Sequence, residues 1–211
     1  KINCFLPYLD PQIIYSTIQK KNSFRDIFFP KYAINNLLNN KFRIKKFRYI
    51  GKDMKYILVA LKEELPDHDL PSSEFQVWYT GVGKVNASIF ATLACIQKDC
   101  DAVINYGTAG TLKPELAGQL LQIGTVRQRD MDARPQADLG VTPFDNSGFD
   151  GDISLCNSAY VLSTGDNFVT SAPELESDCV DMEGYAIAKV CKHFQKPFIC
   201  YKYISDLADE N

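Results

Sequence analysis

From Met54 onward, short apolar runs alternate with stretches of helical periodicity, and this alternation constrains the fold more than any other feature. Apolar side chains recur at helical spacing in residues 85–97. The strand-like runs are residues 56–60, 75–79, 102–105, 124–129, 159–163 and 198–206. Strands that alternate with helices favour an α/β domain, so we predict three αβα layers with a central mixed, largely parallel sheet.

Composition limits the chemistry available to such a domain. The seven cysteines are an odd number without a CxxC pair, which favours reduced thiols and a cytoplasmic protein over a disulfide framework. With only His68 and His193, the chain is poorly supplied for a zinc site or a histidine-based triad. We therefore expect no metal and no cofactor, and acid–base chemistry carried by carboxylates.

Residues 1–53 differ in charge from the rest of the chain. They hold eleven Lys or Arg against three Asp, although the whole chain carries −3. One interpretation is a basic arm for nucleic acid or an anionic membrane surface. The other, which we favour, is a peripheral extension ahead of a domain at residues 54–211. No run reaches the roughly 18 apolar residues of a membrane span, so we expect no membrane partner.

The closing segment places acids at the ends of predicted elements. Asp181 and Glu183 stand where a helix begins, and Pro197 ends that helix. Acids at a helix start are often simple capping residues. The last strand signal ends in Asp206, and ligands of open α/β sheets bind outside the carboxyl ends of strands. Asp206 is therefore a candidate reacting group.

Two glycine-rich segments indicate where a ligand could approach the backbone. Residues 107–110 (Gly-Thr-Ala-Gly) follow a strand signal and carry only small side chains. Residues 81–84 (Gly-Val-Gly-Lys) lack the earlier glycine and the following Ser or Thr of a Walker loop, which excludes a nucleotide triphosphatase. This second segment is either a modest anion or hydroxyl site at a helix start or a tight strand-to-helix turn.

Other charged residues are less informative alone. A pair such as Glu63 and Glu64 on a surface usually has no catalytic role. Three arginines are interleaved with two aspartates, which predicts a solvated or interface ladder. These residues are Arg127, Arg129, Asp130, Asp132 and Arg134.

Six segments occur together and in order in one family. They are residues 60–64 (Ala-Leu-Lys-Glu-Glu), 81–87 (Gly-Val-Gly-Lys-Val-Asn-Ala), 105–110 (Asn-Tyr-Gly-Thr-Ala-Gly), 165–168 (Gly-Asp-Asn-Phe), 181–183 (Asp-Met-Glu) and 204–206 (Ile-Ser-Asp). On these motifs the chain resembles the nucleoside phosphorylase/hydrolase superfamily, and most closely its methylthioadenosine/S-adenosylhomocysteine nucleosidases. The resemblance implies a homodimer that hydrolyses the purine N-glycosidic bond of adenine nucleosides and releases adenine.

The resemblance also implies a role for each matching residue. Asp206 would donate a proton toward N7 of the purine, and Ser205 would orient that acid. Glu64 would position and deprotonate the attacking water. Glu183 would accept hydrogen bonds from the ribose hydroxyls. The other implied substrate-binding residues are Met182 against the sugar, Phe168 and the Val169 backbone on the purine, Thr108, Ala109 and Gly110 along the pocket, and Phe144 in a loop that often reaches the partner subunit's site.

Hydrolysis and phosphorolysis require different side chains in the loop after the first predicted strand, which here is residues 61–65. Family phosphorylases hold phosphate with an arginine soon after the first strand, whereas this loop carries acids that would repel phosphate. Lys202 stands where the nucleosidases usually have arginine, and Asp181 replaces a more usual glutamate. The chain also stops at Asn211, where the family continues into a long helix, so we predict that the C-terminal helix is missing.

Two alternatives to the nucleosidase remain. A purine nucleoside phosphorylase would share most of these motifs. A non-catalytic nucleoside-binding homologue would share them too, and is suggested by the missing helix.

Overall fold

The computed structural model describes residues 53–65, 73–111, 113–149 and 151–208. All of them belong to one of the two units into which the chain divides, Gly51–Asn211. The basic extension, except for Asp53, lies outside the described residues, and so do residues 209–211, after which the final helix is predicted to be missing. Within the described part, no helix combines the length and apolar character needed to cross a membrane.

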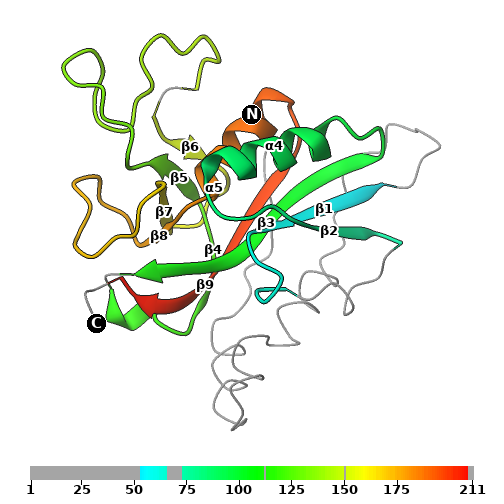
Figure 1. The fold of residues 1–211 in the computed structure, drawn as a ribbon, viewed down its shortest axis with the longest axis horizontal. Helices are drawn as coiled ribbons and strands as arrows, with labels where there is room; N and C mark the ends of the chain where they lie inside the picture. Colours follow the sequence, from blue (N-terminus) through cyan, green and yellow to red (C-terminus); the bar gives the residue numbers. More distant parts are fainter. Residues whose placement is uncertain (1–52, 66–72, 112, 150, 209–211) are drawn as a thin grey trace, which may run out of the picture. The chain divides into compact units, whose positions relative to one another are not determined.

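The described residues form a nine-stranded sheet with two α-helices (Figure 1). The strands are β1 (Met54–Val59), β2 (Phe75–Tyr79), β3 (Cys100–Thr111), β4 (Leu120–Gln122), β5 (Thr125–Gln128), β6 (Ile153–Ser154), β7 (Val161–Thr164), β8 (Cys179–Asp181) and β9 (Phe198–Leu207). The helices are α4 (Lys84–Cys95) and α5 (Gly184–His193), with a short 3₁₀ turn η2 (Pro114–Leu116).

The sheet is mixed, as predicted. Its main path runs β2-β1-β3-β8-β7-β5-β6, and β9 pairs with β3 and β4 beside this path. Parallel pairing joins β1 to β2 and β3, β3 to β9, β5 to β7 and β7 to β8. The antiparallel pairs are β3 with β8, β4 with β9 and β5 with β6. The α/β fold class is thus confirmed.

Strand β3 is longer than the sequence indicates. The glycine-rich composition of residues 107–110 predicts that the strand ends at Asn105, but the chain stays extended to Thr111. The reason is pairing with β9: Gly107 lies opposite Lys202, and Gly110 lies opposite Asp206. Small side chains therefore stand inside a paired strand, where they leave space above the backbone.

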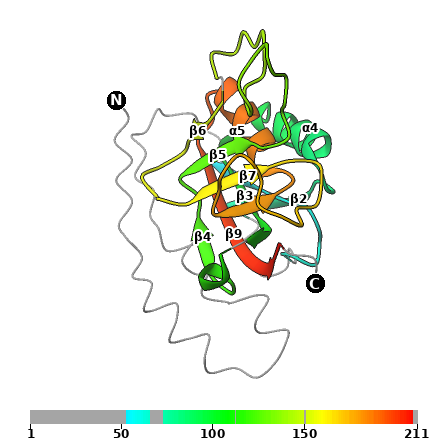
Figure 2. The same ribbon diagram turned by 90° about the vertical axis from the view of Figure 1, so that its left-hand side faces the viewer.

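The helices α4 and α5 pack side by side against the sheet (Figures 1 and 2). The inner face of α4 is built of small residues, Ala87, Ala91 and Ala94, which are fully buried. They share one hydrophobic cluster with Ile187 and Cys191 of α5. Because alanine allows close approach of two helices, the N-termini of both helices come to one end of the sheet.

Candidate active site

Glu64 lies in the turn after β1, and its carboxylate is fixed over β3. The Oε1 atom accepts hydrogen bonds from the backbone N–H of Thr108 (2.8 Å) and from its hydroxyl (2.7 Å). The Oε2 atom accepts from the N–H of Leu61 at 3.0 Å. A Cβ on Gly107 would stand 3.2 Å from Oε1, so the glycine leaves the room that this carboxylate occupies. The parallel pairing of β1 with β3 thus joins two segments that are weak signals separately.

Asp206 lies on β9, the strand that pairs in parallel with β3 through residues 103–111 of β3. It is exposed on β9, and its Oδ1 accepts a short hydrogen bond from the Ser205 hydroxyl. Asp206 lies opposite Gly110, where a Cβ would stand 3.3 Å from Oδ2. The buried Ala109 separates this glycine from Thr108. Glu64 and Asp206 therefore each lie over a glycine of one strand, β3.

Glu183 holds the start of α4 to the start of α5. It occupies the N-cap position of α5, yet its side chain makes no cap hydrogen bond there. Instead, its Oε1 accepts a hydrogen bond from the N–H of Gly83, at the N-cap of α4, at 2.8 Å. The residue is only 6% exposed. Burial, and then the charge of the nearby Asp181, raise the pKa of Glu183 to about 7.

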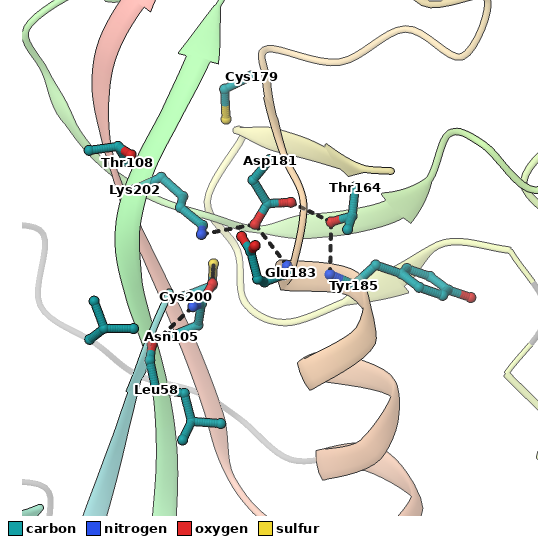
Figure 3. Close-up of polar contacts among 12 residues, drawn as sticks. Leu58, Asn105, Thr108, Thr164, Cys179, Asp181, Glu183, Tyr185, Cys200 and Lys202 are labelled. Carbon is teal, nitrogen blue, oxygen red and sulfur yellow. Dashed lines mark hydrogen bonds and ion pairs between the residues drawn. The ribbon is translucent and has the colours of Figure 1, made fainter. Parts of the chain in front are cut away.

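Asp181 is the capping acid of α5 and the partner of a buried lysine (Figure 3). Its Oδ2 accepts hydrogen bonds from the N–H of Gly184 (2.8 Å) and from Lys202 Nζ (2.8 Å). Its Oδ1 accepts from the Thr164 hydroxyl at 2.6 Å, and that hydroxyl accepts from the N–H of Tyr185. Burial alone would lower the pKa of Lys202, but the Asp181 carboxylate outweighs it and raises that pKa.

The glycine turn at residues 81–84 is a strand-to-helix turn whose amides are already bound. Gly81 and Gly83 have positive φ angles of 74° and 97°, which favour glycine. The N–H of Gly83 donates to Glu183, and the N–H of Lys84 donates to Asp166 Oδ1 at 2.8 Å. Of the two interpretations of this segment, the tight turn is the one observed, and carboxylates of the chain itself occupy its anion-binding amides.

A hollow of about 290 Å³ lies at this end of α4. Its lining includes Val82, Gly83, Asp166 and Met182. Met182 therefore borders the same space as the glycine that binds Glu183. Small-molecule sites are typically concave, with a few fixed polar groups among apolar ones, and this hollow has that character.

The two aromatic candidates lie in different loops. Phe168 is 88% exposed and follows the turn that contains Asp166; Val169, next in the chain, is partly buried. Phe144 is also 88% exposed, but it borders a separate hollow of about 600 Å³ lined by residues 135–138 and 141–146 of its own loop. Phe168 therefore stands two residues after Asp166, which lines the Met182 hollow, whereas Phe144 lines the separate one.

The predicted ladder of arginines is only partly correct. Arg127 pairs with Asp152 at 2.5 Å, and Arg134 pairs with Asp132 and Glu174 at 2.6 Å each, all partly exposed. Arg129 is different: it is 8% exposed, and its guanidinium donates to backbone carbonyls. Sequence reasoning missed this because an arginine in a charged run normally stays in water.

Metal ligation has no support in the described residues. Within residues 53–65, 73–111, 113–149 and 151–208, no three His, Cys, Asp or Glu side chains are grouped to hold an ion.

Comparison with known protein families identifies the relatives of this fold. A family model described as the phosphorylase superfamily matches residues 74–211, which is more than half of the chain. The chain belongs to the phosphorylase superfamily. The resemblance inferred from the six sequence motifs is thereby confirmed.

Solved structures of phosphorylase-superfamily relatives agree with this assignment. The 5′-methylthioadenosine/S-adenosylhomocysteine nucleosidase of Helicobacter pylori is 25% identical, with a TM-score of 0.66 over 76% of this chain and 88% of that one. The futalosine hydrolase of H. pylori is 24% identical, with a TM-score of 0.65 over 75% and 87%. The nucleosidase of Colwellia psychrerythraea, solved with adenine, is 20% identical, with a TM-score of 0.62 over 77% and 86%.

These superfamily relatives bind small molecules. The H. pylori nucleosidase structure holds a pyrrolidinol that carries a 4-aminopyrrolopyrimidine and a thioether. The nucleosidase and the futalosine hydrolase match this chain almost equally well, so the likeness shows the superfamily and the fold without selecting a substrate.

Proposed function

We propose that this protein is a purine nucleosidase that hydrolyses the N-glycosidic bond of 5′-substituted thioadenosines, such as methylthioadenosine or S-adenosylhomocysteine, and releases adenine. The observation that carries the proposal is the placement of Glu64 and Asp206 over Gly107 and Gly110 of one strand. Two carboxylates, one in the turn after β1 and one on β9, both lie beside β3 and would supply the base and the acid that such a hydrolysis needs.

In the proposed step, Glu64 acts on water and Asp206 acts on the purine. Glu64 takes a proton from water, whose oxygen bonds to the anomeric carbon as the bond from that carbon to N9 breaks. The bonding electrons pass into the purine, and Asp206 gives its proton to N7. General acid and base groups each contribute typically 10²–10⁴-fold to rate. The Ser205 hydroxyl, hydrogen-bonded to Asp206, orients the acid.

The sugar and the base are held by other residues. Glu183, buried beside Gly83, accepts hydrogen bonds from the ribose hydroxyls, and Met182 packs on the sugar. Phe168 is free to stack on a purine because 88% of it is exposed, and the Val169 backbone reads the edge of the base. The methyl group of Ala109 packs in the hydrophobic core, so only its backbone is available to border the base.

Hydrolysis is favoured over phosphorolysis because the hydrogen-bond donors that could hold a phosphate already bind carboxylates. The amides of Gly83, Lys84 and Thr108 already bind carboxylates of the chain, and Lys202 is paired with Asp181. A phosphate would have to displace these carboxylates and would meet Glu64.

Purified protein tests this proposal directly. Release of the free purine base is measured in phosphate-free buffer for methylthioadenosine, S-adenosylhomocysteine, adenosine, AMP and futalosine. The proposal expects release of adenine and a free sugar with a 5′-thioether substrate. A strict requirement for phosphate would show a phosphorylase, and tight binding without turnover would show a nucleoside-binding protein.

We further propose that the nucleosidase is a homodimer joined through α4. The outward face of this helix carries apolar side chains at helical spacing, which a monomer would leave in water. These are Val85 (71% exposed), Ile89 (52%), Leu93 (42%) and Ile96 (55%). The stripe begins next to the Met182 hollow, so a second subunit here would border the substrate.

The cell compartment and pathway follow from the same proposal. The six cysteines of the described residues are free thiols, which supports the reducing cytoplasm. Release of adenine from methylthioadenosine would serve methionine salvage.

A further inference from the structure

The end of β5 is bound to the turn that carries the purine-stacking residue. The Arg129 guanidinium donates hydrogen bonds to the carbonyls of Gly165 (3.1 Å) and Asn167 (2.6 Å), on either side of Asp166. It also donates to the carbonyls of Ser163 (2.7 Å) and Asp181 (2.8 Å). One side chain therefore joins the end of β7, the end of β8 and the turn before Phe168.

Asp130, the residue after Arg129, binds a backbone N–H of the same turn. Its Oδ2 accepts a hydrogen bond from the N–H of Asp166 at 2.9 Å. Both of its oxygens bind Lys84 Nζ, at 2.6 and 2.8 Å. The Asp166 carboxylate in turn accepts from the N–H of Lys84. Arg129 thus binds the carbonyls of Gly165 and Asn167, and Asp130 binds the N–H of Asp166. Both aspartates also bind Lys84, which connects the turn to the start of α4.

The fit around Arg129 is close. A Cβ on Gly165 would stand 3.0 Å from the Arg129 Cζ atom, so the turn passes directly over the guanidinium. Burial lowers the pKa of Arg129, although an arginine still keeps its charge. Burying a cation is costly unless hydrogen bonds compensate, and here four backbone carbonyls accept from the two terminal nitrogens of the guanidinium, while Nε is buried without a partner.

We propose that Arg129 and Asp130 are positioning residues for purine recognition. They fix residues 165–167 so that Phe168 and Val169 are held ready for the base, and they do not touch the substrate themselves. This inference rests on the proposed function, in which Phe168 stacks on the purine. It adds two residues outside the six matched motifs to the determinants of base binding.

The proposal predicts a separation of binding from chemistry. Glu64 and Asp206 lie on other elements, so loosening the turn leaves the reacting groups in place. Removing hydrogen bonds to a charged group costs about one to two powers of ten in an equilibrium constant. Asp130→Ala is therefore expected to raise both the KM for nucleoside and the Kd for free adenine about tenfold or more, with kcat changed less than threefold. A variant that merely misfolds would lower apparent kcat and leave KM unchanged.

Matched variants complete the test. Arg129→Lys keeps the charge but cannot reach all four carbonyls, so it should show an intermediate rise in KM and Kd. Arg127→Gln alters an arginine on the same strand that binds Glu176 and Asp152, outside this turn, and should leave both constants unchanged. Asp130→Ala and Arg129→Lys together decide the role of the turn.

The outcomes separate this inference from the proposed function. Adenine release by the wild-type protein decides the function, and free-adenine binding by calorimetry decides the role of the turn. Unchanged KM and adenine Kd in both Asp130→Ala and Arg129→Lys would overturn the positioning role, even if the wild type is active. A fall in kcat alone, or an equal rise in Kd for Arg127→Gln, would also overturn it.

Discussion

Lys202 and Asp181 form a buried ion pair, with Nζ 2.8 Å from Oδ2 and side chains only 2% and 1% exposed. These are the two positions at which the sequence departs from the arginine and glutamate usual in the nucleosidases. The structure shows that the two departures face each other as an ion pair. The pair stands beside Glu183 and anchors the start of α5 to β9.

Lys202→Met should destabilise the fold by about 3–5 kcal/mol, because it leaves the Asp181 carboxylate buried without its cation. The free energy of unfolding in urea measures this. The double variant Lys202→Met with Asp181→Asn should recover part of the loss. Lys113→Met is the control, because its pair with Asp178 is partly exposed and worth at most about 1 kcal/mol. Equal stability of Lys202→Met and wild type would show that the pair is unimportant.

Activity should fall as pH drops through about 7, the raised pKa of Glu183, because the protonated acid no longer accepts from both ribose hydroxyls. A pH profile of kcat/KM measures this, and Glu183→Gln should lack that inflection. Stability gives an independent check. The folded pKa lies above the ordinary 4.5, so Glu183 costs stability increasingly as pH rises from 4.5 through about 7. A wild-type profile with the same inflection as Glu183→Gln would contradict the assignment.

Two glycines offer probes that add a methyl group without removing a functional side chain. Gly107→Ala would place a Cβ 3.2 Å from Glu64 Oε1, and Gly110→Ala would place one 3.3 Å from Asp206 Oδ2. Each should displace its carboxylate by a few tenths of an ångström and lower kcat about 10- to 100-fold. Gly148→Ala serves as a control for the methyl group, since its Cβ would meet no atom within 4 Å, although its φ of 72° adds strain. A kcat unchanged in both test variants would remove these carboxylates from the reaction.

The dimer proposal predicts that Ile89→Lys yields monomers, because it places a charge in the middle of the apolar stripe of α4. Mass measured by light scattering after gel filtration tests this. Glu115→Lys, on an exposed part of η2, makes a charge change of at least equal size and should leave the mass at two subunits. A wild-type protein that is already monomeric would contradict the proposal.

Local pattern was enough to locate most elements. Strand β2 was predicted as residues 75–79 and is Phe75–Tyr79, because its apolar run is bounded by turn residues. The end of β3 was not predictable in this way. A Gly-Thr-Ala-Gly run is typical of a turn, and only pairing with β9, about one hundred residues away in sequence, keeps it extended.

The candidate site also combines residues that local sequence indicates with residues that only the folded chain brings together. Glu64 and Asp206 were singled out because they lie in motifs that resemble the superfamily in combination, and their catalytic roles stay predictions. The burial of Arg129 could not be predicted, since it depends on four carbonyls from β7, β8 and the following turn, which come together only in the folded chain. The buried pairing of Lys202 with Asp181 has the same origin, because nothing in either local sequence indicates that the two side chains meet.

The central claim is that Glu64 and Asp206 act as base and acid, and one comparison tests it most directly. Adenine release from methylthioadenosine is measured for wild type, Glu64→Gln and Asp206→Asn in phosphate-free buffer. Glutamine can still accept from Thr108 through its carbonyl oxygen, so Glu64→Gln removes basicity and keeps both contacts to Thr108, although its NH2 group cannot accept from the N–H of Leu61 as Oε2 does. The account predicts that each variant is slower by about 10²–10⁴-fold and binds adenine within a few fold of wild type. Equal rates in all three proteins would contradict it.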